Sequence, residues 1–407
     1  MKQTVEQKIK WVKNRSYYSE YNEDELKHFT NEEIKGVLQF QRTHDDYTNT
    51  PLYSLKRLAN YLNVADIKVK DESKRFGLNA FKVMGGIYAV GKYLADVLGK
   101  DIQTLSFAEL RSPQIKEQLG ELTFISATDG NHGRSVAWAA RELGHKSVIY
   151  MPKGSSLERL TAIRNEGAEA DITDVNYDET VRLCARLAEE NGWIMVQDTA
   201  WEGYDEIPLW IMQGYAAIAQ EILEELETQS EKTPTHIFLQ AGVGSFAAGI
   251  AAYFTEHFKE QAPKIIVVEP NLADCYYRSF QNESGAMQFV TGDMNTIMAG
   301  LACGEPNTRA FRILSQYAWA AYSCEDSISA LGMRVLGNPL GEDPKIISGE
   351  SGAVPLGLLV HLCTQQENLE SRQALELDSS SRVLIISTEG DTDHQHYLDV
   401  VWKGLYS

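Results

Sequence analysis

Short apolar runs alternate with longer helical patterns along most of this chain of 407 residues. The apolar runs predict strands at 66–70, 122–127, 147–151, 168–173, 193–197, 236–241, 264–269 and 382–387. The helical patterns predict helices at 80–98, 132–143, 157–166, 178–191 and 216–226. Strands that alternate with helices form βαβ units, in which helices cover both faces of a parallel sheet. The sequence therefore predicts an α/β fold.

The alternation falls into two blocks, which indicates two open, mostly parallel twisted sheets flanked by helices. We expect residues 87–204 to form a smaller α/β domain, and residues 1–86 with 205–407 to form a larger one. The segment before residue 87 contains few predicted strands and could pack on either block. A polar stretch at 365–381 predicts a surface loop or a frayed helix.

Charge and cysteine content narrow the classes of partner. The formal net charge is -19, which argues against a protein that binds nucleic acid or anionic lipid through clustered basic residues. No apolar run approaches the ~20 residues of a membrane-spanning helix, and the first residues lack the apolar core of a signal peptide. The five cysteines are scattered without a C-x-x-C pair, which favours reduced thiols, a cytoplasmic location and no metal site.

A lysine stands where the helix at 80–98 is predicted to begin, in the stretch Asn79-Ala80-Phe81-Lys82. Asn79 has the residue type of a helix N-cap. The positive end of a helix dipole disfavours the charged form of a nearby lysine, and the neutral amine is the form that attacks carbonyl groups. Taken alone, the pattern also fits an ordinary surface lysine.

A glycine-containing turn, Thr128-Asp129-Gly130-Asn131, separates the predicted strand at 122–127 from the next helix. Such turns lie at the carboxyl edge of a parallel sheet, where α/β proteins bind ligands. Asp129 offers a carboxylate there, and Asn131 offers an amide. The alternative interpretation is a plain turn in which Asp129 caps the helix.

Two later stretches follow predicted strands in the same way. Gly242-Val243-Gly244-Ser245 precedes a helix, and free backbone amides at such a position can hold a phosphate. Its glycine spacing does not match the dinucleotide pattern G-x-G-x-x-G. Ser387 ends the strand at 382–387, where its hydroxyl could bond a ring nitrogen. Asp391 or Asp393, just beyond it, could cap the final helix, and both interpretations can hold together.

In this order, the four stretches resemble the fold type II enzymes that use pyridoxal phosphate (PLP), the group of the tryptophan synthase β-subunit and threonine dehydratase. The resemblance implies that Lys82 holds PLP as an imine, that Asn131 contacts the ring hydroxyl, and that Ser387 faces the pyridine nitrogen. It also implies that the phosphate is bound by Gly242, Val243, Gly244 and Ser245. PLP would then lie in the cleft between the domains, with the larger domain as the PLP-binding one.

Departures from the threonine dehydratase pattern indicate a subfamily. Met84 stands where those enzymes usually carry arginine, and Thr128-Asp129 replaces a serine pair. With the stretches 197–204 and 387–393, the combination looks like the diaminopropionate ammonia-lyases. These are carbon–nitrogen lyases of amino-acid catabolism that convert D- and L-2,3-diaminopropionate to pyruvate and two ammonia molecules, and they are typically homodimers. The segment 350–353 also resembles one that lies beside the cofactor ring in the wider group.

The resemblance, together with the charges, suggests roles for the site residues. Lys82 would be the base on one face of Cα, and Asp129 the second base on the other face, for the substrate of opposite hand. We expect Thr128, Asp129 and Asp198 to bind the substrate, the two carboxylates matching its extra ammonium and the turn amides its carboxylate. A serine at the ring nitrogen would leave that nitrogen largely neutral, which suits elimination over transamination or racemisation.

Other functions fit parts of the sequence. A serine/threonine dehydratase or a cysteine-synthase-like enzyme of the same fold would offer neutral hydroxyls where this chain has Asp129 and Asp198. A nicotinamide-dependent oxidoreductase could use the loop at Gly242, but it leaves Lys82 unexplained. A non-catalytic nucleotide-binding module is the simplest alternative.

Overall fold

Two β-sheets form the framework of the protein, and the computed structural model describes residues 8–18 and 23–407. The larger sheet has the order β1-β10-β9-β8-β11-β3-β2, and the smaller has the order β6-β5-β4-β7. The strands of the larger sheet are β1 (Ile9–Lys13), β2 (Leu52–Ser54), β3 (Asp66–Asp71), β8 (His236–Gln240), β9 (Lys264–Pro270), β10 (Ala318–Cys324) and β11 (Arg382–Ser387). Those of the smaller sheet are β4 (Thr123–Ala127), β5 (Lys146–Met151), β6 (Glu169–Ile172) and β7 (Ile194–Met195). Among the strands of the described residues, only the edge strands β1 and β2 run antiparallel to their neighbours, so the predicted fold class is confirmed.

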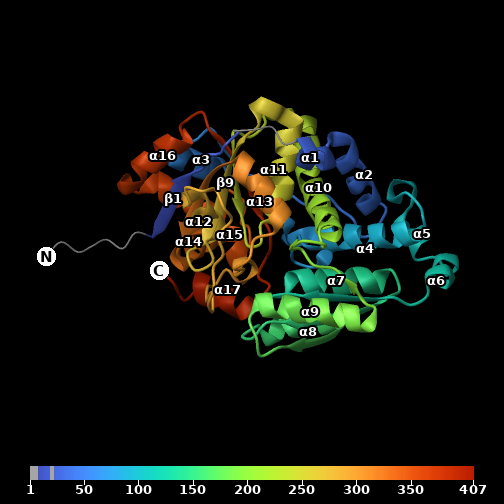
Figure 1. Cartoon of the computed structure of the whole chain (residues 1–407). Helices are drawn as coiled ribbons and strands as arrows, with labels where there is room; N and C mark the ends of the chain where they lie inside the picture. The colour runs from blue at the N-terminus through green and yellow to red at the C-terminus, as the bar shows by residue number, and fades with distance from the viewer. Residues whose placement is uncertain (1–7, 19–22) are drawn as a thin grey trace.

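Helices cover both sheets (Figure 1). They are α1 (Glu23–Leu26), α2 (Asn31–Arg42), α3 (Lys56–Leu62), α4 (Val83–Val97), α5 (Phe107–Leu110), α6 (Pro113–Leu119), α7 (Asn131–Glu142), α8 (Leu157–Asn165), α9 (Tyr177–Asn191), α10 (Glu206–Thr228), α11 (Ser245–Phe258), α12 (Cys275–Gln281), α13 (Thr308–Tyr317), α14 (Asp326–Gly337), α15 (Glu350–Thr364), α16 (Leu369–Leu375) and α17 (His394–Val401). Figure 1 shows α7, α8 and α9 grouped at one end of the molecule. Helix α4 lies between α10 and α7 and packs against both, which joins this group to the rest of the fold.

The central strands of the larger sheet are buried on both faces. Alternate side chains therefore enter two different cores: Ile237 and Leu239 of β8 pack in one core, and Phe238 between them packs in the other. In β11, Leu384 joins the first core and Ile385 the second. This period of two explains why these strands read as unbroken apolar runs in the sequence.

Several elements differ from the sequence-based prediction. Strands β1, β2 and β10 were not predicted, because the first two are short edge strands and β10 contains three alanines in place of β-branched residues. Strand β7 spans two residues, whereas the prediction covered 193–197. The polar stretch 365–381, predicted as a surface loop or a frayed helix, does contain a short helix, α16. The strands of the smaller sheet all lie between residues 123 and 195, while the domain edges stay a prediction.

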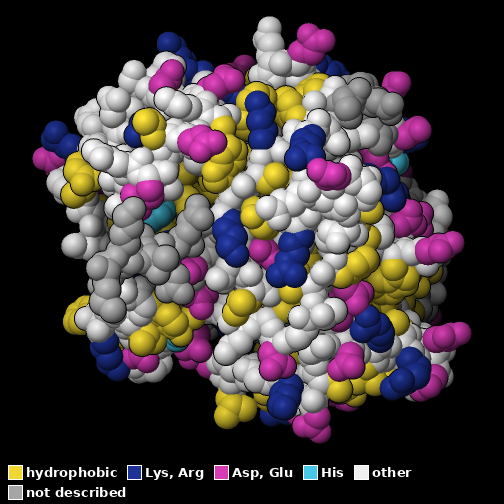
Figure 2. Space-filling view, turned by 60° about the vertical axis from the view of Figure 1, so that its left-hand side comes forward, with side chains coloured by type: hydrophobic (Ala, Val, Ile, Leu, Met, Phe, Trp, Pro, Cys, Tyr) yellow, Lys and Arg dark blue, Asp and Glu magenta, His cyan; other side chains and the backbone are white. Residues whose placement is uncertain are grey.

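The structure also bears on the sequence-based expectations about membrane spans, metal sites, disulfides and surface charge. Within residues 8–18 and 23–407, no helix is both long and apolar enough to cross a bilayer. In the same described part of the chain, no group of three histidine, cysteine or acidic side chains is placed to hold a metal ion. All five cysteines are free thiols. Acidic and basic side chains are intermixed over the face shown in Figure 2.

A buried ionic network ties the end of β3 to α10. The Arg75 guanidinium has no exposed surface and pairs with Glu72 at 2.8 Å and with Glu221 at 3.1 Å. The Lys70 amine, also fully buried, lies 2.6 Å from Glu221. Burial favours the neutral form of Glu221, but Arg75 and Lys70 outweigh it and lower its pKa to about 2. The network therefore anchors the chain a few residues before Lys82.

Replacing Glu221 with glutamine is expected to destabilise the fold strongly, because it leaves Arg75 and Lys70 short of countercharge in the interior. We expect a loss of about 3–5 kcal/mol at pH 7, measured by urea unfolding. Because the folded pKa of Glu221 lies below its unfolded value, the native protein should also lose this contribution as the pH falls from about 4.5 towards 2. The exposed Glu227 on the same helix is the control: Glu227→Gln should change stability by less than about 0.5 kcal/mol. Equal effects of the two variants would contradict this account.

Candidate active site

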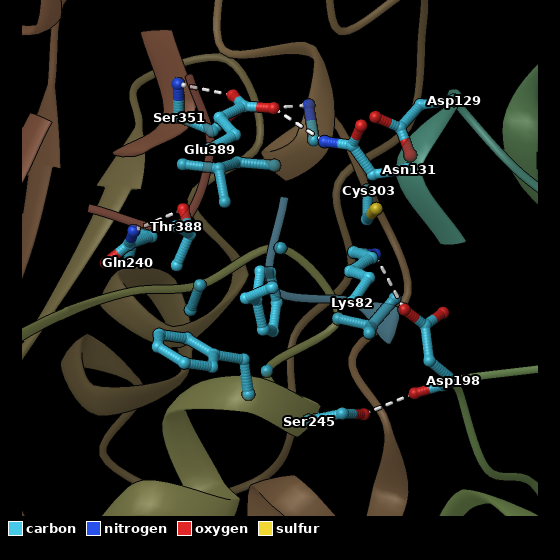
Figure 3. Close-up of a pocket in the computed structure, with 18 of the residues that line it drawn as sticks. Lys82, Asp129, Asn131, Asp198, Gln240, Ser245, Cys303, Ser351, Thr388 and Glu389 are labelled. Carbon is cyan, nitrogen blue, oxygen red and sulfur yellow. Dashed lines mark hydrogen bonds and ion pairs between the residues drawn. The ribbon is translucent and has the colours of Figure 1, made fainter. Parts of the chain in front are cut away.

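The carboxyl ends of strands from both sheets meet at one cavity, here called the Lys82 cavity (Figure 3). Most of the residues predicted from the sequence line it, namely Lys82, Asp129, Asn131, Asp198, Gly242, Val243, Gly244 and Ser245. Thr128 and Ser387 do not line it. Residues that the sequence-based argument did not assign also contribute to the wall, among them Tyr177, Tyr215, Gln240, Cys303, Thr388 and Glu389.

Lys82 directly precedes helix α4, but the predicted cap is wrong. No side chain caps this helix, which begins at Val83. Asn79 instead adopts a left-handed conformation with φ of 60°, and its side-chain amide donates to Asp391 at 3.3 Å. The lysine-bearing turn is held by backbone bonds: the Phe81 amide donates to the Thr388 carbonyl at 2.9 Å. The turn is thus fastened to the segment that follows β11.

The Lys82 amine pairs with Asp198, at 2.7 Å between Nζ and Oδ2. Burial lowers the pKa of Lys82, but Asp198, with smaller contributions from Tyr215 and Asp129, outweighs burial and raises it above its ordinary value. Burial likewise raises the pKa of Asp198, yet Lys82 lowers it to about 2. The prediction of a neutral amine is therefore wrong for this arrangement, because a carboxylate in contact outweighs a helix dipole. The same contact places Asp198 against the Lys82 amine, so its carboxylate is not free to bind a substrate ammonium in this arrangement.

The turn after β4 is organised by Thr128. Its buried hydroxyl accepts hydrogen bonds from the amides of Gly130, at 2.8 Å, and Gly133, at 2.9 Å. The Thr128 amide donates to the Tyr150 carbonyl. Thr128 therefore supports the start of α7 and does not line the Lys82 cavity, while its contact with a substrate stays a prediction. The same bonds exclude the alternative in which Asp129 caps the helix.

Asp129 and Asn131 both reach the Lys82 cavity from this turn. The Asp129 carboxylate is half-buried and lies beside Gly300, where an added Cβ would come 3.5 Å from Oδ2. The Asn131 amide donates to the Glu389 carboxylate at 2.6 Å, and the other oxygen of that carboxylate accepts from the Ser351 amide at 3.2 Å. Glu389 thereby links the turn after β4 to the end of β11 and the start of α15. In Figure 3, Lys82 lies between Asp129 and Asp198.

The loop from Gly242 to Ser245 has the form expected of an anion cradle. Gly244 has a φ of 94°, and a Cβ there would overlap the Tyr276 hydroxyl, so only glycine fits. That hydroxyl donates to the Val243 carbonyl at 2.9 Å. No side chain caps helix α11, so its first amides are open towards the cavity, while the Ser245 hydroxyl donates to the Asp198 carbonyl. Open amides at a helix start suit a phosphate.

The structure does not place Ser387 on the cavity wall. Its side chain is fully buried, and its hydroxyl donates to Ser348 at 2.8 Å. Alternate residues of a strand face opposite sides, so Ser387 points to the same side of β11 as Ile385, which packs in the second core. Thr388 is the hydroxyl that lines the cavity, where it accepts from Gln240 at 2.7 Å. The period of two in β11 was the signal that could have located Thr388 from the sequence.

Asp393 was predicted as one of two possible caps of the final helix, and this is confirmed: its carboxylate accepts from the His396 amide at 3.0 Å. Gln240 was missed, although a polar residue at the end of the apolar strand β8 is a usable signal. Glu389 was considered only as part of an acidic turn. Tyr215 lies within the long helix α10, and no local pattern distinguishes it from a core residue.

These residues fit pyridoxal phosphate. An uncapped helix start beside a glycine that tolerates no side chain suits its phosphate. A lysine amine inside the same cavity suits its carbonyl carbon, and the Thr388 hydroxyl offers a partner for a ring nitrogen. One cavity therefore provides separate partners for the three reactive ends of this cofactor.

Comparisons with known proteins agree with this geometry. The sequence profile of the family described as "Pyridoxal-phosphate dependent enzyme" matches residues 44–389. The chain is 53% identical to a diaminopropionate ammonia-lyase of Salmonella typhimurium, over 90% of this chain and 91% of that protein. It resembles the solved structure of the Escherichia coli diaminopropionate ammonia-lyase in complex with D-serine, with a TM-score of 0.91, 48% identity and 98% of each chain covered. The E. coli structure with an aminoacrylate-PLP azomethine reaction intermediate has a TM-score of 0.90, 49% identity and the same coverage. The chain therefore belongs to the diaminopropionate ammonia-lyase family of pyridoxal-phosphate-dependent enzymes.

Proposed function

We propose that this carbon–nitrogen lyase acts on both the D and the L form of 2,3-diaminopropionate, which with water gives pyruvate and two ammonia molecules. The observation that carries the proposal is the presence of two separate basic groups, the Lys82 amine and the Asp129 carboxylate, on the wall of one cavity. They come from different elements, one before α4 and one after β4. Two such groups could each remove the Cα proton from one of the two enantiomers of a substrate.

Lys82 is the proposed base for one hand. Bound PLP withdraws electrons from Cα of the amino acid attached to it and so acidifies the Cα proton. Once an amino acid has replaced Lys82 on the cofactor, the freed neutral amine of Lys82 would receive that proton at Nζ, and Asp198 at 2.7 Å would stabilise the ammonium that results. An ammonium held inside the cavity can next give a proton to the β-nitrogen, which leaves well only when protonated. Asp198 thus acts through Lys82 and not as a contact to the substrate ammonium.

Asp129 is the proposed base for the other hand. Its carboxylate lines the Lys82 cavity, and among the described residues no hydrogen bond or ion pair engages it. A half-buried carboxylate without a fixed partner can accept a proton and can also attract the extra ammonium of a diamino acid. The acidic character of Asp129 supports a diamino acid over the hydroxy amino acids.

The remaining contacts would hold the cofactor. We assign the phosphate to the amides of residues 242–245 and one contact of the ring to Asn131, whose amide is oriented by Glu389. We assign the pyridine nitrogen to the hydroxyl of Thr388 in place of Ser387, because only Thr388 lines the cavity. A hydroxyl partner, in contrast to a carboxylate, would leave this nitrogen largely unprotonated.

We infer a homodimer on the resemblance alone.

We also propose residues 1–86 and 205–407 as the PLP-binding domain and residues 87–204 as the smaller domain. The placement of every strand of the smaller sheet between residues 123 and 195 supports this division.

Lys82→Ala should abolish covalent attachment of PLP. Borohydride treatment of the wild-type protein is expected to fix the cofactor on the Lys82 amine, which intact-protein mass spectrometry detects as an added mass. The exposed Lys74, eight residues earlier, supplies the control: Lys74→Ala should still gain this mass. Labelling of the Lys82→Ala variant to the wild-type extent would contradict the assignment.

Asp129→Asn should affect the turnover of the two enantiomers of the substrate differently. We expect its turnover to fall by ~10²–10⁴-fold for one isomer of diaminopropionate and to stay near the wild-type value for the other, because general base catalysis is lost on one face only. The measurement is the initial rate of pyruvate formation from each isomer. Asp171→Asn, at an exposed position, should leave both rates unchanged. An equal loss on both isomers would refute the two-base proposal.

A further inference from the structure

Gln240 and Thr388 meet at the ends of the neighbouring strands β8 and β11. Both side chains are buried, and both line the Lys82 cavity. The side-chain nitrogen of Gln240 donates to the Ile386 carbonyl at 3.1 Å and to the Thr388 hydroxyl oxygen at 2.7 Å. Figure 3 shows Gln240 and Thr388 joined in this way. None of the proposed steps uses Gln240.

The direction of these hydrogen bonds follows from counting donors. A backbone carbonyl can only accept, so the amide nitrogen of Gln240, and not its oxygen, must face Ile386. The reverse orientation would bring two acceptor oxygens together. The nitrogen carries two hydrogens, one for Ile386 and one for Thr388, and its oxygen is buried without a partner. The Thr388 oxygen is therefore an acceptor towards Gln240.

The hydroxyl hydrogen of Thr388 is left for another acceptor. Among the described residues, Thr388 Oγ1 has no second hydrogen-bond partner, and its side chain lines the cavity. The Thr388 carbonyl is engaged separately by the Phe81 amide at 2.9 Å, which fixes the residue beside the lysine-bearing turn. The hydroxyl is thus prepared as a donor into the cavity.

We propose that Gln240 is a positioning residue that makes Thr388 a hydrogen-bond donor to the pyridine nitrogen of bound PLP. Gln240 occupies one lone pair of the hydroxyl and leaves its hydrogen directed elsewhere, so donation from Thr388 to that nitrogen is favoured over acceptance from it. The nitrogen then stays unprotonated, and the cofactor is a weaker electron sink. This inference rests on the proposed placement of the pyridine nitrogen at Thr388.

The test is the ¹⁵N resonance of protein loaded with PLP labelled at the ring nitrogen, which reports protonation and hydrogen bonding without substrate. In the wild-type protein, we expect an unprotonated, hydrogen-bonded nitrogen. Thr388→Val keeps the side-chain shape but removes the hydroxyl, so the resonance should move to that of a nitrogen without a bonded donor. Thr388→Ser should keep the wild-type position.

Gln240→Met should move the resonance towards the position seen in Thr388→Val, because the hydroxyl is no longer oriented. In the Thr388→Val background, the same substitution should have no further effect, since Gln240 acts through Thr388. Gln240→Glu is a second variant with nearly the native shape. A carboxylate can only accept, so the Thr388 hydrogen turns to it and the resonance should again leave the wild-type position.

Gln41 supplies a matched control. It is also a buried glutamine whose nitrogen donates to two carbonyls, those of Met84 and Gly214, and whose oxygen has no partner. Gln41→Met should leave the ¹⁵N resonance unchanged. A wild-type resonance in both Gln240 variants, or equal shifts for Gln240→Met with and without the Thr388 hydroxyl, would overturn the inference. An unchanged resonance in Thr388→Val would instead overturn the proposed placement of the ring nitrogen at Thr388. This outcome is distinguishable from a failure of the inference about Gln240.

Discussion

The ion pair between Lys82 and Asp198 is the contact on which the site depends. A buried ammonium is costly unless a carboxylate lies against it, and the 2.7 Å contact meets this requirement. The pair joins two distant parts of the chain, because Lys82 precedes α4 and Asp198 follows β7 of the smaller sheet. The Asp198 carbonyl also accepts from Ser245 at the start of α11. One residue therefore positions both the reactive amine and the loop suited to the phosphate.

The other polar groups of the cavity orient one another in the same manner. Glu389 accepts from Asn131 and from the Ser351 amide, so a single carboxylate aligns three segments of the chain. Gln240 orients the Thr388 hydroxyl, and the Thr388 carbonyl holds the turn that carries Lys82. Asp129 is the exception, since it lines the cavity and makes no such bond to any residue that the structure describes. A carboxylate left free among fixed neighbours is the natural candidate for proton transfer.

The sequence predicted where the functional loops lie, because buried strands and the turns after them leave a local pattern. It could not predict the charge state of Lys82, since that depends on Asp198, 116 residues away. Asn79 looked like a cap, but its left-handed backbone made it part of a turn. Ser387 does not line the cavity whereas Thr388 does, and this shift of one residue on a strand means the opposite face. Strand β10 escaped prediction because its three alanines give a weak local signal for a strand, although it pairs with both β9 and β1.

The central proposal is that a single cavity removes the Cα proton from either enantiomer of a diamino acid. The most direct measurement is the initial rate of keto-acid release by the PLP-loaded protein from D- and L-2,3-diaminopropionate, beside L-serine and L-threonine. The account predicts turnover of both diaminopropionate isomers, and slower release from the hydroxy amino acids, which lack the extra ammonium. Turnover of one diaminopropionate isomer only, or a preference for L-serine or L-threonine, would contradict it.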